Sequence, residues 1–192
     1  MTQVRKRLKD DLEPILRLPD PGPKLKGNGS RPAAIFWYPP RHEFALRREV
    51  MDLQTRLVGS AGKRVTVISL AECLDAALAA RGFDAAQMIE LETKVGLKTM
   101  ANTVTDVLKK ERFADLVAAR LPHEPDPARD VVFIVRAGAL YPVYRTSALL
   151  DHLSAALTVP TVLFYPGALD HPSGLCFMGV HTADSSYRTR IF

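Results

Sequence analysis

The sequence has few cysteines and no long apolar run. Its 192 residues include two cysteines, Cys73 and Cys176, whose spacing matches no metal site, so we expect a reducing compartment. No apolar stretch approaches the roughly 20 residues that cross a bilayer. The charged N-terminus also lacks the apolar stretch of a signal peptide. The sequence therefore predicts a cytoplasmic protein that does not bind a membrane.

Catalytic and cofactor-binding motifs are missing as well. No P-loop and no Gly-x-Gly-x-x-Gly occurs, so no backbone cradle for phosphates is expected. The five histidines are scattered, with no His-x-x-x-His and no Cys-x-x-Cys. No Gly-x-Ser-x-Gly elbow is present for a hydrolase serine. We therefore predict no catalytic residue, no cofactor, no metal ligand and no enzymatic activity.

What is present is the composition of one globular domain. Apolar residues make up 47% of the chain and charged residues 24%, close to globular averages. A chain of this length buries roughly 70% of its unfolded surface and needs neither disulfides nor metal to stay folded. Disordered, collagen-like and coiled-coil classes are excluded.

The net charge of +5 is concentrated near the N-terminus. Residues 1–31 carry eight Lys or Arg and four Asp or Glu, and the rest of the chain is nearly neutral. Residues 1–18 have the spacing of a short helix, and 19–32 form a linker rich in Pro and Gly. We predict a basic arm and linker at 1–32 and a single α/β domain at 33–192. The arm is either a solvated leader or a contact for an acidic partner or phosphates. In both cases the core should fold without it. Its candidate contact residues are Arg5, Lys6, Arg7 and Lys9.

From residue 33 the pattern alternates between strand and helix signals. Short apolar runs predict strands at 34–38, 64–69, 131–135 and 161–165, with weaker ones at 175–178 and 187–191. Helical spacing predicts helices at 43–58, 71–81 and 143–157, and two more within 84–121 that part near Gly96.

Near-continuous apolar strands separated by helices favour a mostly parallel sheet covered on both faces. We predict a three-layer, Rossmann-like α/β fold with about four core strands and a helical insertion at 84–121. The last two segments have no room for a helix between them, so we expect an antiparallel C-terminal edge.

An aromatic or apolar residue followed by Tyr-Pro occurs after three of the predicted core strands. The tyrosines are Tyr38, Tyr141 and Tyr165. One interpretation is a set of rigid corners, since proline stops a strand and fits a helix start. The other is an aromatic rim for a protein partner, because tyrosine and arginine favour interface hot spots. The candidate partner-binding residues are Tyr38, Arg136, Tyr141, Arg145, Tyr165 and Arg188.

At these residues the chain resembles BrxB, a small component of bacterial BREX phage-defence systems. The resemblance covers about 160 residues, from the first predicted strand to the C-terminus. The matching motifs are Tyr38-Pro39-Pro40, Gly138 with Tyr141-Pro142 and Arg145, Leu163 to Gly167, and Phe177-Met178-Gly179 followed by Tyr187-Arg188.

The resemblance implies a non-catalytic adaptor that binds a PglZ-like phosphatase-family protein and acts with other BREX components, including a methyltransferase. DNA binding is expected to be weak or indirect at most, because the predicted domain is nearly neutral. The alternative from the residues alone is a degenerate nucleotide- or metal-dependent enzyme that uses the loops at the strand ends.

Overall fold

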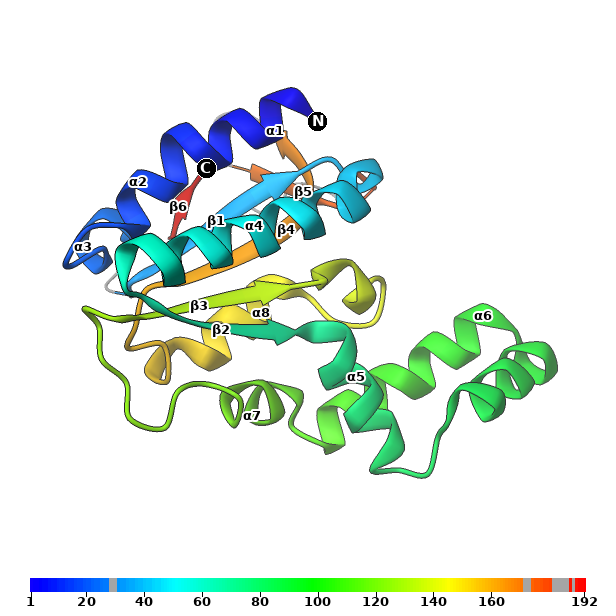
Figure 1. The fold of residues 1–192 in the computed structure, drawn as a ribbon. Coiled ribbons are helices and arrows are strands. Elements are labelled where there is room, and N and C mark those ends of the chain that lie inside the picture. The colour runs from blue at the N-terminus through cyan, green and yellow to red at the C-terminus, as the bar shows by residue number, and fades with distance from the viewer. Residues whose placement is uncertain (28–30, 171–173, 181–186, 188) are drawn as a thin grey trace.

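Six strands form one sheet between two helical layers in the computed structural model, which describes residues 1–27, 31–170, 174–180, 187 and 189–192 (Figure 1). The path through the sheet is β2-β3-β4-β1-β6, and β5 pairs with the far end of β4. The bounds are Ala33–Tyr38 (β1), Arg64–Ser69 (β2), Asp130–Val135 (β3), Thr161–Asp170 (β4), Gly174–Phe177 (β5) and Arg190–Ile191 (β6). The predicted three-layer α/β class and its four parallel core strands are confirmed.

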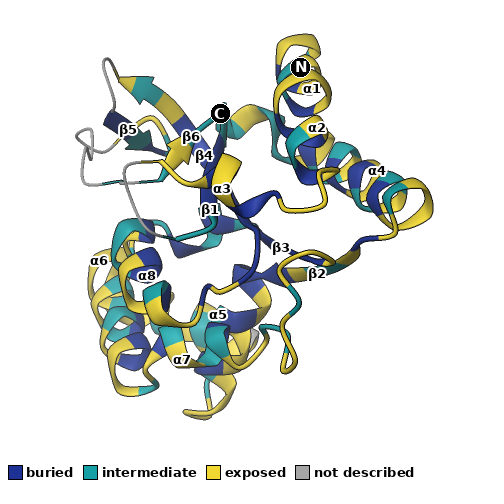
Figure 2. Ribbon diagram, turned by 90° about the vertical axis from the view of Figure 1, so that its left-hand side faces the viewer, coloured by how far each residue is buried: buried dark blue, intermediate teal, exposed yellow. Residues whose placement is uncertain are grey.

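Alternating side chains on the central strands build two separate hydrophobic cores. In β1, Ala33 and Ile35 join one core, whereas Ala34 and Phe36 join the other. This follows from the two-residue period of a strand, which sends neighbouring side chains to opposite faces. Both faces of the sheet are therefore buried. Figure 2 shows the buried residues gathered along the strands and on the inner sides of the helices.

The helix α4 (Glu43–Ala61) covers one face of the sheet. It buries Leu46, Val50, Leu53 and Leu57, which recur at helical spacing and place one apolar stripe against the strands. The helix runs three residues past its predicted end and stops at Gly62, whose left-handed φ of 62° suits glycine best.

The N-terminal segment lies on the same face and belongs to the core. It consists of α1 (Thr2–Arg7), a π-helical turn at Leu8–Leu12, α2 (Glu13–Leu16) and α3 (Gly22–Leu25). The π-helical turn ends two residues before Pro14, which lacks the N–H of a regular helical bond. Leu8, Leu12 and Leu16 are fully buried in the same core as Phe36. The predicted separation of residues 1–32 from the domain is thus wrong, because one side of this helical segment is an apolar stripe packed on the domain.

The opposite face is covered by α5 (Leu70–Ala79), α7 (Phe113–Ala118) and α8 (Thr146–His152). The helix predicted at 143–157 is shorter than expected at both ends. Residues 137–145 instead form turns around Pro142, beginning with a 3-10 helix at Ala137–Leu140, and α8 starts only after Arg145. The predicted Tyr-Pro corner is therefore longer than a simple strand-to-helix junction.

The C-terminal part departs from the prediction in two ways. Strand β4 continues through Pro166 and Gly167, because its far half pairs antiparallel with β5. A side chain at Gly167 would collide with the carbonyl oxygen of Cys176, so glycine permits this close pairing. Of the two C-terminal segments predicted to form an antiparallel edge, only β5 pairs antiparallel, and its partner is β4. The last strand, β6, instead pairs parallel with β1 and forms the outer edge.

The predicted helical insertion is α6 (Ala85–Lys110), which extends away from the sheet (Figure 1). Its helical course is broken at Gly96, with φ 77° and ψ 161°, as the sequence predicted. We call residues 85–95 the first arm and 97–110 the second arm. Within the described residues, no helix is both long and apolar enough to cross a membrane.

Candidate protein-interaction surface

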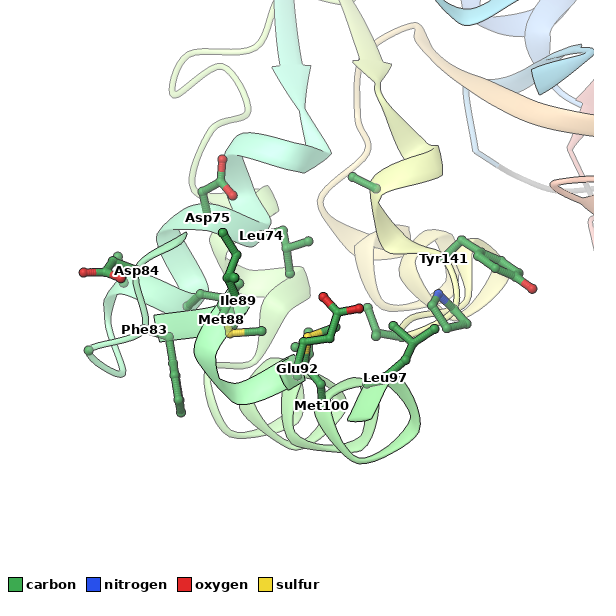
Figure 3. A pocket seen from close by; sticks show the side chains of 18 residues that line it. Leu74, Asp75, Phe83, Asp84, Met88, Ile89, Glu92, Leu97, Met100 and Tyr141 are labelled. Carbon is green, nitrogen blue, oxygen red and sulfur yellow. The ribbon is translucent and has the colours of Figure 1, made fainter. Parts of the chain in front are cut away.

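A cavity of about 880 Å³ opens between α5 and the two arms of α6. We call it the α5–α6 groove. It is bounded by α5, by the connection 82–84, by both arms, and by the corner at 139–143. Figure 3 shows side chains from all these segments arranged around it, among them Leu74, Met88 and Met100. Its volume lies in the range of ligand pockets, and most of its lining side chains are apolar.

Two local sequence signals position the first arm of α6, which forms one wall of this groove. After α5 the chain turns at Gly82, which has a φ of 76°, and the Phe83 N–H bonds back to the Leu78 carbonyl at 3.0 Å. Asp84 then starts α6 with a capping box. Its carboxylate accepts from the Gln87 N–H and the Gln87 side chain accepts from the Asp84 N–H, both at 2.8 Å. These two signals fix the first arm relative to α5.

The two arms differ in how firmly they are packed. The second arm buries Val104, Val107 and Leu108, and the Thr105 hydroxyl is shared between the Ala101 carbonyl at 2.9 Å and the Val143 carbonyl at 3.2 Å. On the first arm Ile89 is 67% exposed, and just past the break Leu97 is 62% exposed. Both of these residues line the groove, so its apolar surface continues onto the outside of the molecule.

The charged residues of the groove all carry the same sign. They are Asp75, Asp84 and Glu92, and all three are exposed. Among the lining residues that the structure describes, there is no Lys, Arg or His. In a chain with a net charge of +5, this is a local reversal of sign.

Arg145 lines a second, smaller cavity of about 610 Å³ on the other side of Val143. Here Arg145 is exposed and lies with Lys109, Arg112 and His152. Of these, Arg112 pairs with Asp115 at 2.8 Å, and no described carboxylate pairs with Arg145. Arg145 therefore lies at the surface, and its role in binding a partner stays a prediction.

The tyrosines Tyr38 and Tyr165 are not surface residues, contrary to prediction. Both are fully buried. The Tyr38 hydroxyl donates to the Glu43 carboxylate, and burial is the main cause that raises the pKa of Tyr38. The Tyr165 hydroxyl donates to the Leu175 carbonyl at 3.3 Å.

The strand register also keeps these two tyrosines apart. In the β1–β4 pair Trp37 lies opposite Tyr165, and Tyr38 lies opposite Pro166. Paired residues share a face of the sheet, so Tyr38 and Tyr165 point into different cores. The three tyrosines therefore do not form one aromatic rim.

The remaining candidates from the strand ends are scattered. Tyr141 is half-buried, lines the α5–α6 groove and packs against Phe177, with ring centroids 6.1 Å apart. Arg136 is half-buried, has a left-handed φ of 59° and directly precedes the 3-10 helix Ala137–Leu140. Arg188 lies outside the described residues.

The basic residues of the N-terminal segment are divided between internal contacts and the surface. Arg7 donates to the Trp37 carbonyl at 2.7 Å and stacks over the Trp37 ring at 4.3 Å. Burial lowers the pKa of Arg7. Arg5 pairs with Glu49 at 3.3 Å, whereas Lys6 and Lys9 are exposed. Two of the four predicted contact residues thus help to attach the segment to its own domain.

Metal-binding geometry is not found in the part of the chain that the structure describes. No group of three or more His, Cys, Asp or Glu side chains converges there. Cys73 is buried in the core, and burial raises the pKa of its thiol.

Apart from Tyr141, the residues that line the groove were not among the candidates predicted from the sequence. The available signal was a set of large apolar residues, Met88, Ile89, Leu97 and Met100, close to a glycine break in an insertion outside the core strands. Helical spacing alone cannot distinguish such residues from a stripe that packs on the protein's own core.

Comparison with known proteins identifies the family to which the chain belongs. The family model described as BREX protein BrxB matches residues 66–191, which include the whole groove. A curated protein of Bacillus cereus (strain H3081.97), also described as BREX protein BrxB, is 28% identical over 155 residues, covering 80% of this chain and 79% of the relative. No solved structure matches the chain. Since the family model covers well over half of the sequence, the chain belongs to the BrxB family of BREX proteins.

Proposed function

We propose that this chain is a non-catalytic adaptor of a BREX-type complex and that it binds a PglZ-like phosphatase-family protein. Membership of the BrxB family supports a role in phage defence. The adaptor role and the partner are inferences from the resemblance and from the surface of the molecule.

The observation that carries the proposal is the open apolar surface of the α5–α6 groove. Ile89 and Leu97 are more than half exposed beside a cavity lined mostly by apolar side chains. Contiguous exposed apolar surface of this kind is typical of sites that bind another macromolecule. A small ligand inside the cavity would leave the outer parts of Ile89 and Leu97 in water, whereas a protein surface can cover both.

The strand ends offer less support for the enzymatic alternative. In open α/β sheets ligands bind beyond the carboxyl ends of the strands. Here Tyr38 is buried at the end of β1 and Tyr165 is buried within β4, and a Cβ placed on Gly138 would lie only 3.4 Å from the Met178 side chain and 3.5 Å from that of Pro166. Protein side chains therefore fill much of this region.

Co-purification tests the adaptor proposal. The tagged full chain is co-expressed with the PglZ-like protein and the other BREX components encoded beside it. We expect the PglZ-like protein to co-elute with the chain in size-exclusion chromatography at physiological salt. Two separate peaks, with no complex in any pairwise combination, would refute the proposal.

A thermal-shift experiment separates the adaptor from the enzymatic alternative. The chain is heated with ATP, GTP, Mg²⁺ or Mn²⁺, because a ligand that binds only the native state raises its Tm. We expect no shift with any of the four. A rise of several degrees with one of them would favour the nucleotide- or metal-dependent enzyme.

A further inference from the structure

Among the described residues that line the α5–α6 groove, none belongs to a strand, so the groove offers a partner side chains but no sheet edge. Its walls are α5 and the two arms of α6, whose backbone groups are largely bonded within the helices. An extended peptide needs a sheet edge to satisfy its own backbone. A helix brings its backbone bonds with it and needs only an apolar channel.

The composition of the groove suits the apolar face of a helix. Leu74 and Leu78 line it from α5 and Val104 from the second arm, and Met88 and Met100 lie on opposite arms. Methionine side chains are flexible and polarisable, so they adapt to different apolar partners. Ile89 and Leu97 extend the same surface outward, where they would cover the flanks of a bound helix.

The charges around the groove indicate the sign of the partner. Asp84 already caps α6 through its bond to Gln87. Asp75 and Glu92 form no ion pair with a described residue. Figure 3 shows Glu92 among the apolar side chains and Asp75 at one edge. Carboxylates placed in this way favour a partner with cationic side chains beside its apolar face, and they disfavour an acidic one.

We propose that the α5–α6 groove binds an amphipathic helix of the partner protein whose apolar face is flanked by Lys or Arg. This inference rests on the proposed adaptor function and specifies the chemistry of the segment that the adaptor recognises. The apolar residues supply the affinity, and Asp75 and Glu92 select the charge.

Substitutions in the groove and on α4 test whether the partner binds at the groove. Ile89→Glu and Leu97→Glu place a charge in the groove. Met51→Glu is the matched control, because Met51 is 66% exposed on α4, on the opposite side of the sheet. We expect each groove variant to weaken binding of the PglZ-like protein at least about tenfold, with an unchanged Tm, and the control to bind as wild type.

Charge reversal tests the second half of the proposal. Glu92→Lys is expected to weaken binding, with the largest loss at low salt, where charges are least screened. Asp52→Lys on the exposed side of α4 is the control and should bind as wild type. Wild-type affinity in all the groove variants, with the complex still formed, would overturn the groove as the site while leaving the adaptor function intact. Failure of the wild-type chain to form any complex would refute the adaptor function itself.

Peptides identify the bound segment. Overlapping peptides of about 20 residues, several helical turns long, are made to span the PglZ-like protein and are titrated against the full chain. We expect the peptides that bind to be helical, apolar on one face and basic at its flanks, and to lose binding to the Leu97→Glu chain. Binding only by acidic or extended segments would overturn the inference.

Discussion

Glu13 shows how a single buried carboxylate attaches the N-terminal helices to the domain. It is 7% exposed and accepts hydrogen bonds from Arg17 at 2.8 Å and from Arg56 at 2.7 Å. The hydrogen bonds from Arg56 are the largest cause that lowers the pKa of Glu13. The stabilisation of the fold by ionised Glu13 is therefore fully present above the usual glutamate pKa of 4.5. It is lost as the pH falls through the lower pKa that Glu13 has in the folded state.

We expect Glu13→Gln to lower the free energy of unfolding by about 2 kcal/mol at neutral pH, since it weakens charge-assisted hydrogen bonds. Urea denaturation at a series of pH values measures this difference. The gap between wild type and variant should narrow under acid conditions as wild-type Glu13 becomes protonated. Equal stability of the two proteins at neutral pH would contradict this account.

Arg145 and Tyr141 have different environments and should respond differently to truncation. Arg145 is exposed in a basic cavity, and as a cation beside the N-terminus of α8 it gains nothing from the helix dipole. We expect Arg145→Ala to weaken partner binding by more than about 1 kcal/mol with an unchanged Tm. Tyr141→Ala should lower the Tm, because it removes the packing against Phe177. Normal partner binding by Arg145→Ala would remove this residue from the interface.

At the scale of elements, the N-terminal helices are needed for the fold. Three fully buried leucines, Leu8, Leu12 and Leu16, contribute roughly 1.5–3 kcal/mol each, a large part of a typical stability of about 5–15 kcal/mol. Deleting residues 1–30 should therefore abolish cooperative thermal unfolding, as followed by circular dichroism. A truncated chain that still unfolds cooperatively near the wild-type Tm would restore the sequence-based view of a dispensable arm.

The core strands could be predicted because their signal is local, whereas the relations between elements could not. The apolar runs of β1 to β4 identify them directly. The register that separates Tyr38 from Tyr165 depends on which residues pair across β1 and β4. Three similar Tyr-Pro motifs carry no information on that pairing. The apolar stripe of the N-terminal helices is visible in the sequence, whereas the basic charge and the Pro-rich segment that follows are typical of a separate arm.

The α5–α6 groove could not be predicted either, because it depends on how helices are placed relative to one another. The break at Gly96 was predicted, but the angle between the two arms was not. That angle, together with the 139–143 corner, decides whether Ile89 and Leu97 pack on the core or face solvent. Such a surface is found only once the elements have been placed in three dimensions.

For the whole molecule, the charge distribution predicts poor DNA binding. The net charge is only +5, and Arg5 and Arg7 are engaged with Glu49 and Trp37 of the same chain. We expect weak, sequence-independent affinity that falls steeply as salt increases, because few phosphates are neutralised. Fluorescence anisotropy with unrelated duplexes at several salt concentrations measures this. A tight, sequence-selective complex at physiological salt would contradict the adaptor account.

Hydrogen exchange tests the central claim, that the chain binds its partner through the α5–α6 groove, most directly. Amide hydrogen exchange of the full chain is measured alone and in complex with the PglZ-like protein. A bound partner slows the local opening of the backbone that it covers, so the amides there exchange more slowly. The account predicts slower exchange in α5, both arms of α6 and the 139–143 corner, with little change in α4. A complex that protects α4 or the edge strand β2 and leaves both arms of α6 unchanged would contradict it.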